Sequence, residues 1–164
     1  MSHTVNITRT TTTVTTSGLF LNTGYFKTIP GLLKFFQAVL GAAAIGLMAQ
    51  NMSDCRYYNL ISRELFFLLV VTTFMIGTVL ILLSCLFSIS TATILPKTFY
   101  ELVYHSFAFV LLLAAGITLL VTVNQYNYNK YRYDELLAAG IITLVNAALY
   151  LVSTVFAYRS YKGL

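Results

Sequence analysis

The sequence predicts an all-α membrane protein in which four transmembrane helices form an antiparallel up-down bundle. Of its 164 residues, 58% are apolar and only 9% are charged, and the mean hydropathy is +0.79. Soluble domains carry about 25% charged residues, and a soluble fold of this size leaves too much surface exposed to hide so many apolar side chains. The composition therefore argues strongly against a water-soluble enzyme.

Four apolar stretches approach or exceed the roughly 20 residues that a helix needs to cross about 30 Å of hydrocarbon. They are continuously apolar and lack the alternation of barrel strands, so each is expected to be a helix. The segments between them are short, which makes consecutive helices antiparallel neighbours. The spans are expected at residues 31–50, 65–89, 102–123 and 136–157, joined by 51–64, 90–101 and 124–135.

The polar ends of the chain complete the domain organisation. Residues 1–23 form a Thr-rich arm without helical period, which we expect to be disordered and cytosolic. Residues 24–162 form the transmembrane domain, and 163–164 are a short C-terminal end.

Basic residues near the spans predict that both termini face the cytosol. The side that holds the termini carries six Lys or Arg and one acid, namely Arg9, Lys27, Lys34, Lys97, Glu101, Arg159 and Lys162. The other side carries four of each sign. On this topology the glycosylation sequons at Asn6 and Asn51 are expected to stay unmodified, because Asn6 is cytosolic and Asn51 lies against the membrane.

Three ionisable residues fall inside or at the start of the predicted spans, where charge is rare and a candidate for function. Lys34 lies close to a helix end, so we expect its amine to snorkel to the headgroups. An ion pair between Lys34 and Glu101 is the alternative. Lys97, Glu101 and His105 follow at i, i+4 and i+8, which predicts one ladder on the third span. His105 could relay protons, but structural hydrogen bonding is the favoured interpretation for it and for the deeper Ser, Thr and Asn residues.

Small residues recur at helical spacing in three of the spans, a pattern that lets helix backbones approach closely. We interpret these rows as packing within the bundle. A homo-oligomer, or association with another membrane protein, would use the same chemistry and stays open. The residues are Ala38, Gly41, Ala42, Gly46, Thr73, Gly77, Gly140, Asn146 and Ala147.

The segment NQYNYNKYRYDE, at 124–135, interleaves tyrosines with Asn and basic residues. Tyrosine favours the membrane interface and is also enriched at protein–protein hot spots. An aromatic belt and an extracellular contact surface are therefore equally weighted interpretations. The tyrosines are Tyr126, Tyr128, Tyr131 and Tyr133.

The sequence offers no motif for catalysis. It contains no Gly-rich phosphate loop, no HExxH and no GxSxG, and its His and Cys residues do not fall at metal-ligand spacing. The basic residues are scattered, unlike the clustered face that nucleic acid requires. We therefore expect no catalytic residue, metal, cofactor or nucleic-acid partner. Cys85 is expected to be an inert buried thiol, with palmitoylation as the alternative, and Cys55 stands alone outside.

The segment GYFKTIPGLLKFFQAVLG, at 24–41, resembles the opening of a MARVEL domain. The matching positions are Thr28, Pro30, Gly31, Lys34, Gln37 and Gly41. The four-span layout is similar to that family from about residue 25 to 162, and the short tails are most similar to the chemokine-like-factor-like and MAL-like members.

The resemblance implies a non-enzymatic organiser of membranes, acting in vesicle trafficking, membrane apposition or fusion, or cell junctions. It also implies membrane lipids as partners, cholesterol-rich ones among them, and a multi-pass protein of the plasma membrane or of vesicles. The alternative from another class is a small oligomeric channel or transporter that uses Lys34, Glu101 and His105.

Overall fold

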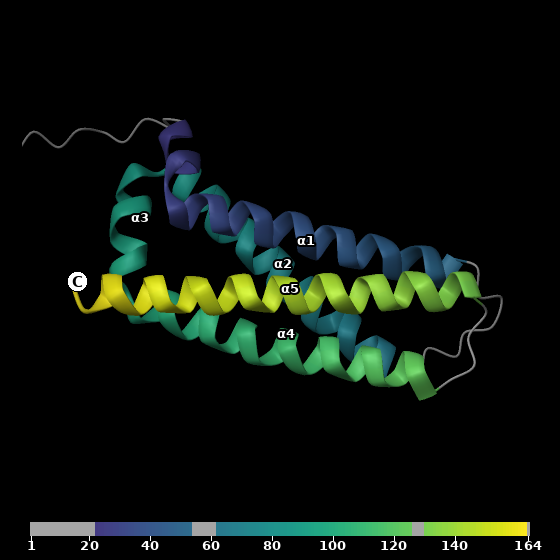
Figure 1. Ribbon diagram of the computed structural model, residues 1–164. Coiled ribbons are helices and arrows are strands. Elements are labelled where there is room, and N and C mark those ends of the chain that lie inside the picture. The colour runs from purple at the N-terminus through teal and green to yellow at the C-terminus, as the bar shows by residue number, and fades with distance from the viewer. Residues whose placement is uncertain (1–21, 54–61, 126–129, 164) are drawn as a thin grey trace, which may run out of the picture.

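The computed structural model describes residues 22–53, 62–125 and 130–163. Within these ranges four helices are long and apolar enough to cross a membrane (Figure 1). They are α1 (Ile29–Ser53), α2 (Ser62–Phe87), α4 (Phe99–Gln125) and α5 (Lys130–Tyr161). The predicted helical membrane bundle is confirmed.

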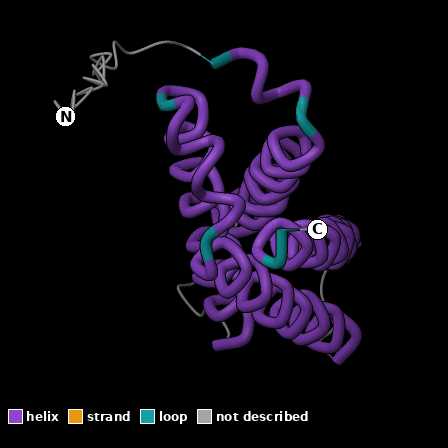
Figure 2. Tube along the Cα trace, turned by 90° about the vertical axis from the view of Figure 1, so that its left-hand side faces the viewer, coloured by secondary structure: helices purple, strands orange, loops and turns teal. Residues whose placement is uncertain are grey.

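The long helices form a closed ring, in which α1 contacts α2 and α5, and α4 also contacts α2 and α5. Each helix runs opposite to both neighbours, as the colours along the chain show in Figure 1, and Figure 2 views the four helices from the end at which the chain finishes. We call the end where α1 begins and α5 finishes the terminal end, and the other the opposite end. The uniformly alternating directions follow from short connections between consecutive helices.

Shorter elements gather at the terminal end. The 3-10 helix η1 (Thr23–Lys27) precedes α1, and α3 (Ile89–Ile94) followed by the 3-10 helix η2 (Leu95–Lys97) joins α2 to α4. In Figure 1, α3 lies across the end of the bundle rather than along it. The connection predicted over residues 90–101 is therefore partly helical, and it is too long, since α4 already begins at Phe99.

The predicted connection at 124–135 is also too long. Helix α4 continues to Gln125 and α5 already begins at Lys130, so Tyr131 and Tyr133 lie on a helix. The charged and polar residues of this segment favour a loop in the sequence. A helix can nevertheless extend beyond the 30 Å hydrocarbon layer into the headgroup region, where such residues are solvated.

The residues that begin α1 explain its local sequence. The backbone N–H and the hydroxyl of Thr28 both donate to the carbonyl of Tyr25, and the N–H of Gly31 donates to the hydroxyl of Thr28 at 3.2 Å. Pro30 is tolerated because a first-turn residue needs no helical N–H bond. A Cβ atom on Gly31 would lie 2.1 Å from the Tyr25 carbonyl oxygen, so this close approach requires glycine.

Helix α4 begins in a similar way. The N–H and the hydroxyl of Thr98 both donate to the carbonyl of Leu95, at 3.0 and 2.7 Å. A Lys-Thr pair thus closes the 3-10 helix before each of these helices, at 27–28 and at 97–98, with the lysine as the last residue of the 3-10 helix. The two turns set where α1 and α4 start, and with that the depth of the first inward-facing side chains.

The interior and the exterior of the bundle are both apolar. The core contains Phe67, Leu112, Leu119, Leu136 and Tyr150, all fully buried. Large apolar side chains also cover the outside, among them Leu69, Leu80, Phe107, Val110 and Val155. Apolar exposure of this extent is typical of a surface that faces lipid.

Candidate functional site: a buried polar cluster in the terminal half of the bundle

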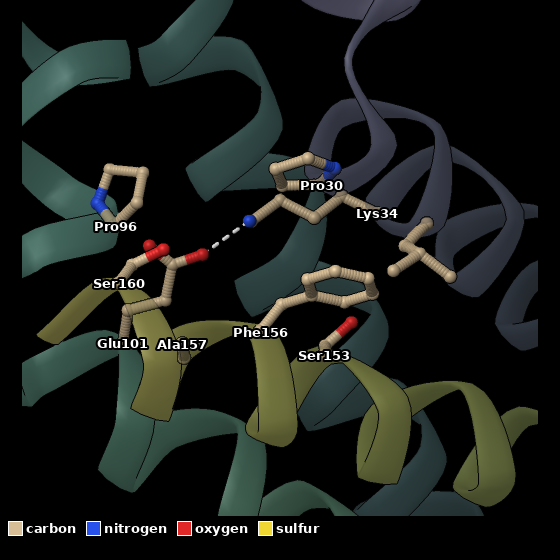
Figure 3. A pocket seen from close by; sticks show the side chains of 9 residues that line it. Pro30, Lys34, Pro96, Glu101, Ser153, Phe156, Ala157 and Ser160 are labelled. Carbon is tan, nitrogen blue, oxygen red and sulfur yellow. Dashed lines mark hydrogen bonds and ion pairs between the residues drawn. The ribbon is translucent and has the colours of Figure 1, made fainter. Parts of the chain in front are cut away.

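Three ionisable side chains meet between α1 and α4. The ammonium of Lys34 donates a hydrogen bond to Oε1 of Glu101, and Nε2 of His105 lies 3.4 Å from the same oxygen. Lys34 and Glu101 are only 1% and 3% exposed, and His105 is fully buried. Figure 3 shows Lys34 pointing toward Glu101 across the space between their helices. The structure thus brings together the three residues that the sequence singled out.

The expected snorkelling of Lys34 does not occur. Lys34 lies on the inward face of α1 with Gln37 and Gly41, all three of them buried. A carboxylate directly across the bundle compensates its charge, and such attraction is strong where the local dielectric is low. The position of Lys34 near a helix end favours snorkelling, but its place on the inward face of α1 directs its amine into the bundle.

The predicted ladder is shorter than expected. Lys97 is exposed and belongs to η2, because α4 begins only at Phe99. Glu101 and His105 lie one helical turn apart on α4 and do approach each other. Of the predicted ladder, therefore, only the contact between Glu101 and His105 is present.

A second layer of hydrogen bonds ties α1 to α5. The side-chain amide of Gln37 donates to the hydroxyl of Ser153 at 2.8 Å, and the amide of Asn146 donates to the backbone carbonyl of Gln37 at 3.2 Å. All three residues are buried. Asn146 was expected to serve structural hydrogen bonding, and its contact with Gln37 is of this kind.

A third layer connects α2, α4 and α5, and sequence reasoning did not find it. The hydroxyls of Tyr104 and Tyr150 both donate to the carbonyl of Phe74, at 3.0 and 3.2 Å, and both also contact the hydroxyl of Thr78. A Cβ atom on Gly77 would lie 2.6 Å from the Tyr104 hydroxyl. Gly77 thus makes room for a tyrosine. The sequence feature that points to Tyr104 is its place next to His105 and three residues after Glu101, on the inward face of α4.

Another buried carboxylate lies at the opposite end of the bundle. Glu64 of α2 is 1% exposed, and Nη2 of Arg132 on α5 lies 3.4 Å from both of its carboxylate oxygens. The Arg132 side chain is 30% exposed. Beside this pair, Arg63 donates to the side-chain carbonyl of Gln125 at 2.7 Å. All three residues fall in the predicted connecting segments, and no sequence pattern pairs them.

The small residues divide into three groups by burial. Gly41, Gly140, Asn146 and Ala147 are buried, and a Cβ atom on Gly41 would lie 3.1 Å from Met75. The expectation of packing within the bundle is wrong for a second group, which is exposed: Ala42, Gly46 and Thr73. Ala38 and Gly77 are half-buried.

The predicted tyrosine surface is described only in part. Tyr131 is 87% exposed, and the hydroxyl of Tyr133 donates to the Asn124 side chain at 3.4 Å. The remaining members, Tyr126 and Tyr128, lie outside the described residues, as do Cys55 and residues 1–21.

Cys85 of α2 is fully buried, as expected for an inert thiol. It packs in a small apolar cluster with Tyr25 of η1. Burial raises the pKa of the Tyr25 hydroxyl well above its usual range, which keeps this side chain neutral. The cluster fastens η1 against the end of α2.

The chemistry available to the polar cluster is that of charge pairing and hydrogen bonding. Within the described residues, no group of three or more His, Cys, Asp or Glu could hold a metal ion. Lys34, Glu101 and His105 lie among packed helices, and they join α1 to α4 inside a predominantly apolar interior. Polar side chains that pair across helices inside a membrane are a recurrent means of holding a bundle together.

Comparison with known proteins assigns most of the bundle to one family. A model of the MARVEL family, described as a membrane-associating domain, matches residues 25–156. Neither the comparison with curated proteins nor the comparison with solved structures gives a match. The family match spans most of the chain, from the turn before α1 to the last turns of α5. It includes the Thr-Ile-Pro-Gly step and both ion pairs. The chain is a multi-pass membrane protein that belongs to the MARVEL family.

Proposed function

We propose that this protein organises membranes through its lipid-embedded helices, in vesicle trafficking, in membrane apposition or fusion, or at cell junctions. The observation that carries the proposal is that the outside of the bundle is apolar, whereas the charged side chains buried inside it are paired with one another. Leu80, Phe107 and Val110 are more than half exposed, whereas Lys34 and Glu101 are buried against each other. The chemistry offered to partners along the spans is therefore that of a lipid-facing surface.

The exposed small residues of α1 support a contact on that surface. Ala42 and Gly46 lie on the outside, and nothing lies within 4 Å of where a Cβ of Gly46 would be. A smooth strip of this kind allows close approach of a flat sterol or of another helix. We propose cholesterol-rich lipid, a second copy of the chain or another membrane protein as its partner.

Reconstitution in vesicles with coexisting ordered and disordered lipid phases tests this strip. Ala42→Leu combined with Gly46→Leu is expected to reduce partition into the sterol-rich phase or to reduce self-association. Ala148→Leu is the control, because Ala148 is an exposed small residue on another helix, α5. Equal behaviour of the two variants would contradict a role for the strip.

The place of action is tested by imaging the endogenous protein, tagged after Leu164, in polarised cells. Labelling at cell contacts would support a junctional organiser, and intracellular puncta would support trafficking or fusion. We propose that both termini face the cytosol, because Lys27, Lys97, Arg159 and Lys162 are exposed at the terminal end. The tag should then become accessible only after permeabilisation, whereas a tag inserted between Gln125 and Lys130 should be accessible before it.

A flux assay on the reconstituted protein separates this proposal from the alternative of a channel or transporter. We expect no flux of protons or small ions from the protein in liposomes. Flux that disappears in Glu101→Gln would overturn the proposal in favour of transport through the polar cluster.

A further inference from the structure

A small cavity adjoins the ion pair between α1 and α4. Its volume is about 20 Å³, and Glu101, Lys34, Ser153 and Ser160 contribute polar side chains to its wall (Figure 3). Pro30, from the first turn of α1, and Pro96, of η2, also line it. The cavity therefore lies where the terminal turns meet the buried charges.

The two oxygens of the Glu101 carboxylate differ in their contacts with the described residues. Oε1 accepts the hydrogen bond from Lys34, whereas Oε2 is buried and has no hydrogen-bond partner among the described residues. The nitrogen atoms of His105 also make no hydrogen bond within that part of the chain. An unsatisfied oxygen on a buried carboxylate is costly, and such groups are normally completed by protein or by ordered water.

The size and the charges of the cavity select among ligands. A volume of about 10–15 Å³ suffices for one water molecule, whereas a lipid headgroup is much larger than this cavity. The ammonium of Lys34 in the wall repels a metal cation, and the carboxylate of Glu101 repels an anion. A neutral ligand that donates hydrogen bonds fits both charges.

A wider hollow adjoins the cavity at the terminal end. Pro30 and Pro96 also line a wider hollow of about 330 Å³, together with Tyr25, Thr28 and Thr93. That hollow lies between η1 and α3, at the end of the bundle where the surrounding medium is the headgroup region and water. The two prolines are common to both walls, so the hollow and the cavity are neighbours separated by these side chains.

We propose that this cavity is a hydration site, in which a water molecule enters from the terminal end and donates a hydrogen bond to Oε2 of Glu101. The second hydrogen of the water lies within the wall that contains Ser153 and Ser160, whose hydroxyl oxygens can accept it. The water connects the buried charges to the aqueous phase on the terminal side of the membrane. It makes the Lys34–Glu101 pair a hydrated pair, although both side chains are almost completely covered by protein.

Water-edited solid-state NMR of the full chain in lipid bilayers tests the site, since the sequence contains only three glutamates: Glu64, Glu101 and Glu135. Labelling them with carbon-13 gives three carboxyl signals, which single Glu→Gln variants assign. Magnetisation from water is expected to reach the Glu101 carboxyl about as fast as that of the partly exposed Glu135. A build-up at Glu101 several times slower than at Glu135 would overturn the proposal.

A variant of the cavity wall distinguishes cavity water from protons that exchange through Lys34. Ser160→Leu places an apolar side chain at the cavity and is expected to slow the build-up at Glu101 by about twofold or more, since the space for one water is lost. Ser90→Leu, at an exposed position of α3, is the control and should leave the rate unchanged. An unchanged rate in folded Ser160→Leu would overturn the proposal. Unchanged carboxyl shifts of Glu64 and Glu135 report that Ser160→Leu is folded. If it is not folded, Ala157→Val, in the same wall, is used in its place.

Discussion

Both ends of the bundle bury a glutamate, and the two carboxylates meet different partners. Glu101 faces Lys34, which is 1% exposed, deep between α1 and α4. Glu64 faces Arg132, whose side chain is 30% exposed and whose Nη2 lies 3.4 Å from both carboxylate oxygens. One pair is enclosed by protein, and the other reaches from the interior to the rim.

The difference indicates that an ion pair contributes more to the stability of the fold when its basic side chain is buried. Removing one partner of an enclosed pair leaves an uncompensated charge, at a cost of about 3–5 kcal/mol. A pair with one exposed member contributes about 0–1 kcal/mol, because water screens the attraction and can replace the partner. The terminal end should therefore be the more sensitive to loss of its base.

The largest effect is expected from Lys34→Met, which leaves the Glu101 carboxylate buried without its ammonium. We expect a loss of about 3–5 kcal/mol in the free energy of unfolding. A thiol-reactive dye can follow unfolding in a Cys55→Ser background, because Cys85 is buried in the folded protein. Lys97→Met is the matched control at an exposed position of the same end. Equal loss in the two variants would mean that the buried pair has no special weight.

The next effect concerns Lys34→Met combined with Glu101→Leu. Replacing both members of a buried pair by apolar residues is often neutral or stabilising, so the double variant should be more stable than Lys34→Met alone. The same dye assay, run as a double-mutant cycle, measures the coupling between the two side chains. Additive losses would show that Lys34 contributes through its packing rather than through the charge of Glu101.

A smaller effect is expected from Gly31→Ala, which tests how closely η1 packs against the first turn of α1 at the terminal end. The new Cβ would lie 2.1 Å from the Tyr25 carbonyl oxygen, so η1 must shift. We expect a loss of about 1–3 kcal/mol, as for other overpacked positions. Gly46→Ala, where nothing lies within 4 Å of the Cβ site, should be neutral or stabilising by up to about 1 kcal/mol. Thermal unfolding of both variants gives the contrast, and a neutral Gly31→Ala would contradict it.

The smallest effect is expected from Arg132→Met at the opposite end. Because its side chain is 30% exposed, water can reach the site that it vacates, and the loss should be about 1 kcal/mol or less. Lys130→Met, at an exposed position of the same helix, is the control. A loss as large as that of Lys34→Met would remove the distinction between the two ends.

Much of the fold could be predicted from the sequence, because spanning a membrane leaves few alternatives. The predicted starts of the spans lie close to Ile29, Ser62 and Phe99, and less close to Lys130. The prediction for the last start is too late, because the polar residues at 130–135 are typical of a loop as well as of a helix end. The Lys-Thr pairs at 27–28 and 97–98 are a visible sequence signal for the two similar helix starts.

The candidate site could be predicted only as a set of residue types. Sequence showed that Lys34, Glu101 and His105 were unusual, and it left open whether Lys34 would snorkel or pair. Thr78 and Tyr104 were not distinguished from other polar residues of the spans, because their partners lie 26 residues apart or more along the chain. Tertiary partners of this kind leave no local pattern.

The sequence by itself determined that the chain enters a membrane as four antiparallel helices, because an apolar run of this length must satisfy its backbone hydrogen bonds internally. Its opening motif also indicated the family. Only the tertiary structure decided which face of each helix points inward, since apolar residues occur all around these helices and give no strong amphipathic signal. That choice turned Lys34 to Glu101 and Glu64 to Arg132, and it turned Ala42 and Gly46 outward. The physical reason is that lipid accepts apolar side chains as readily as the core does, so the few buried polar groups and the close fit of small residues fix the packing.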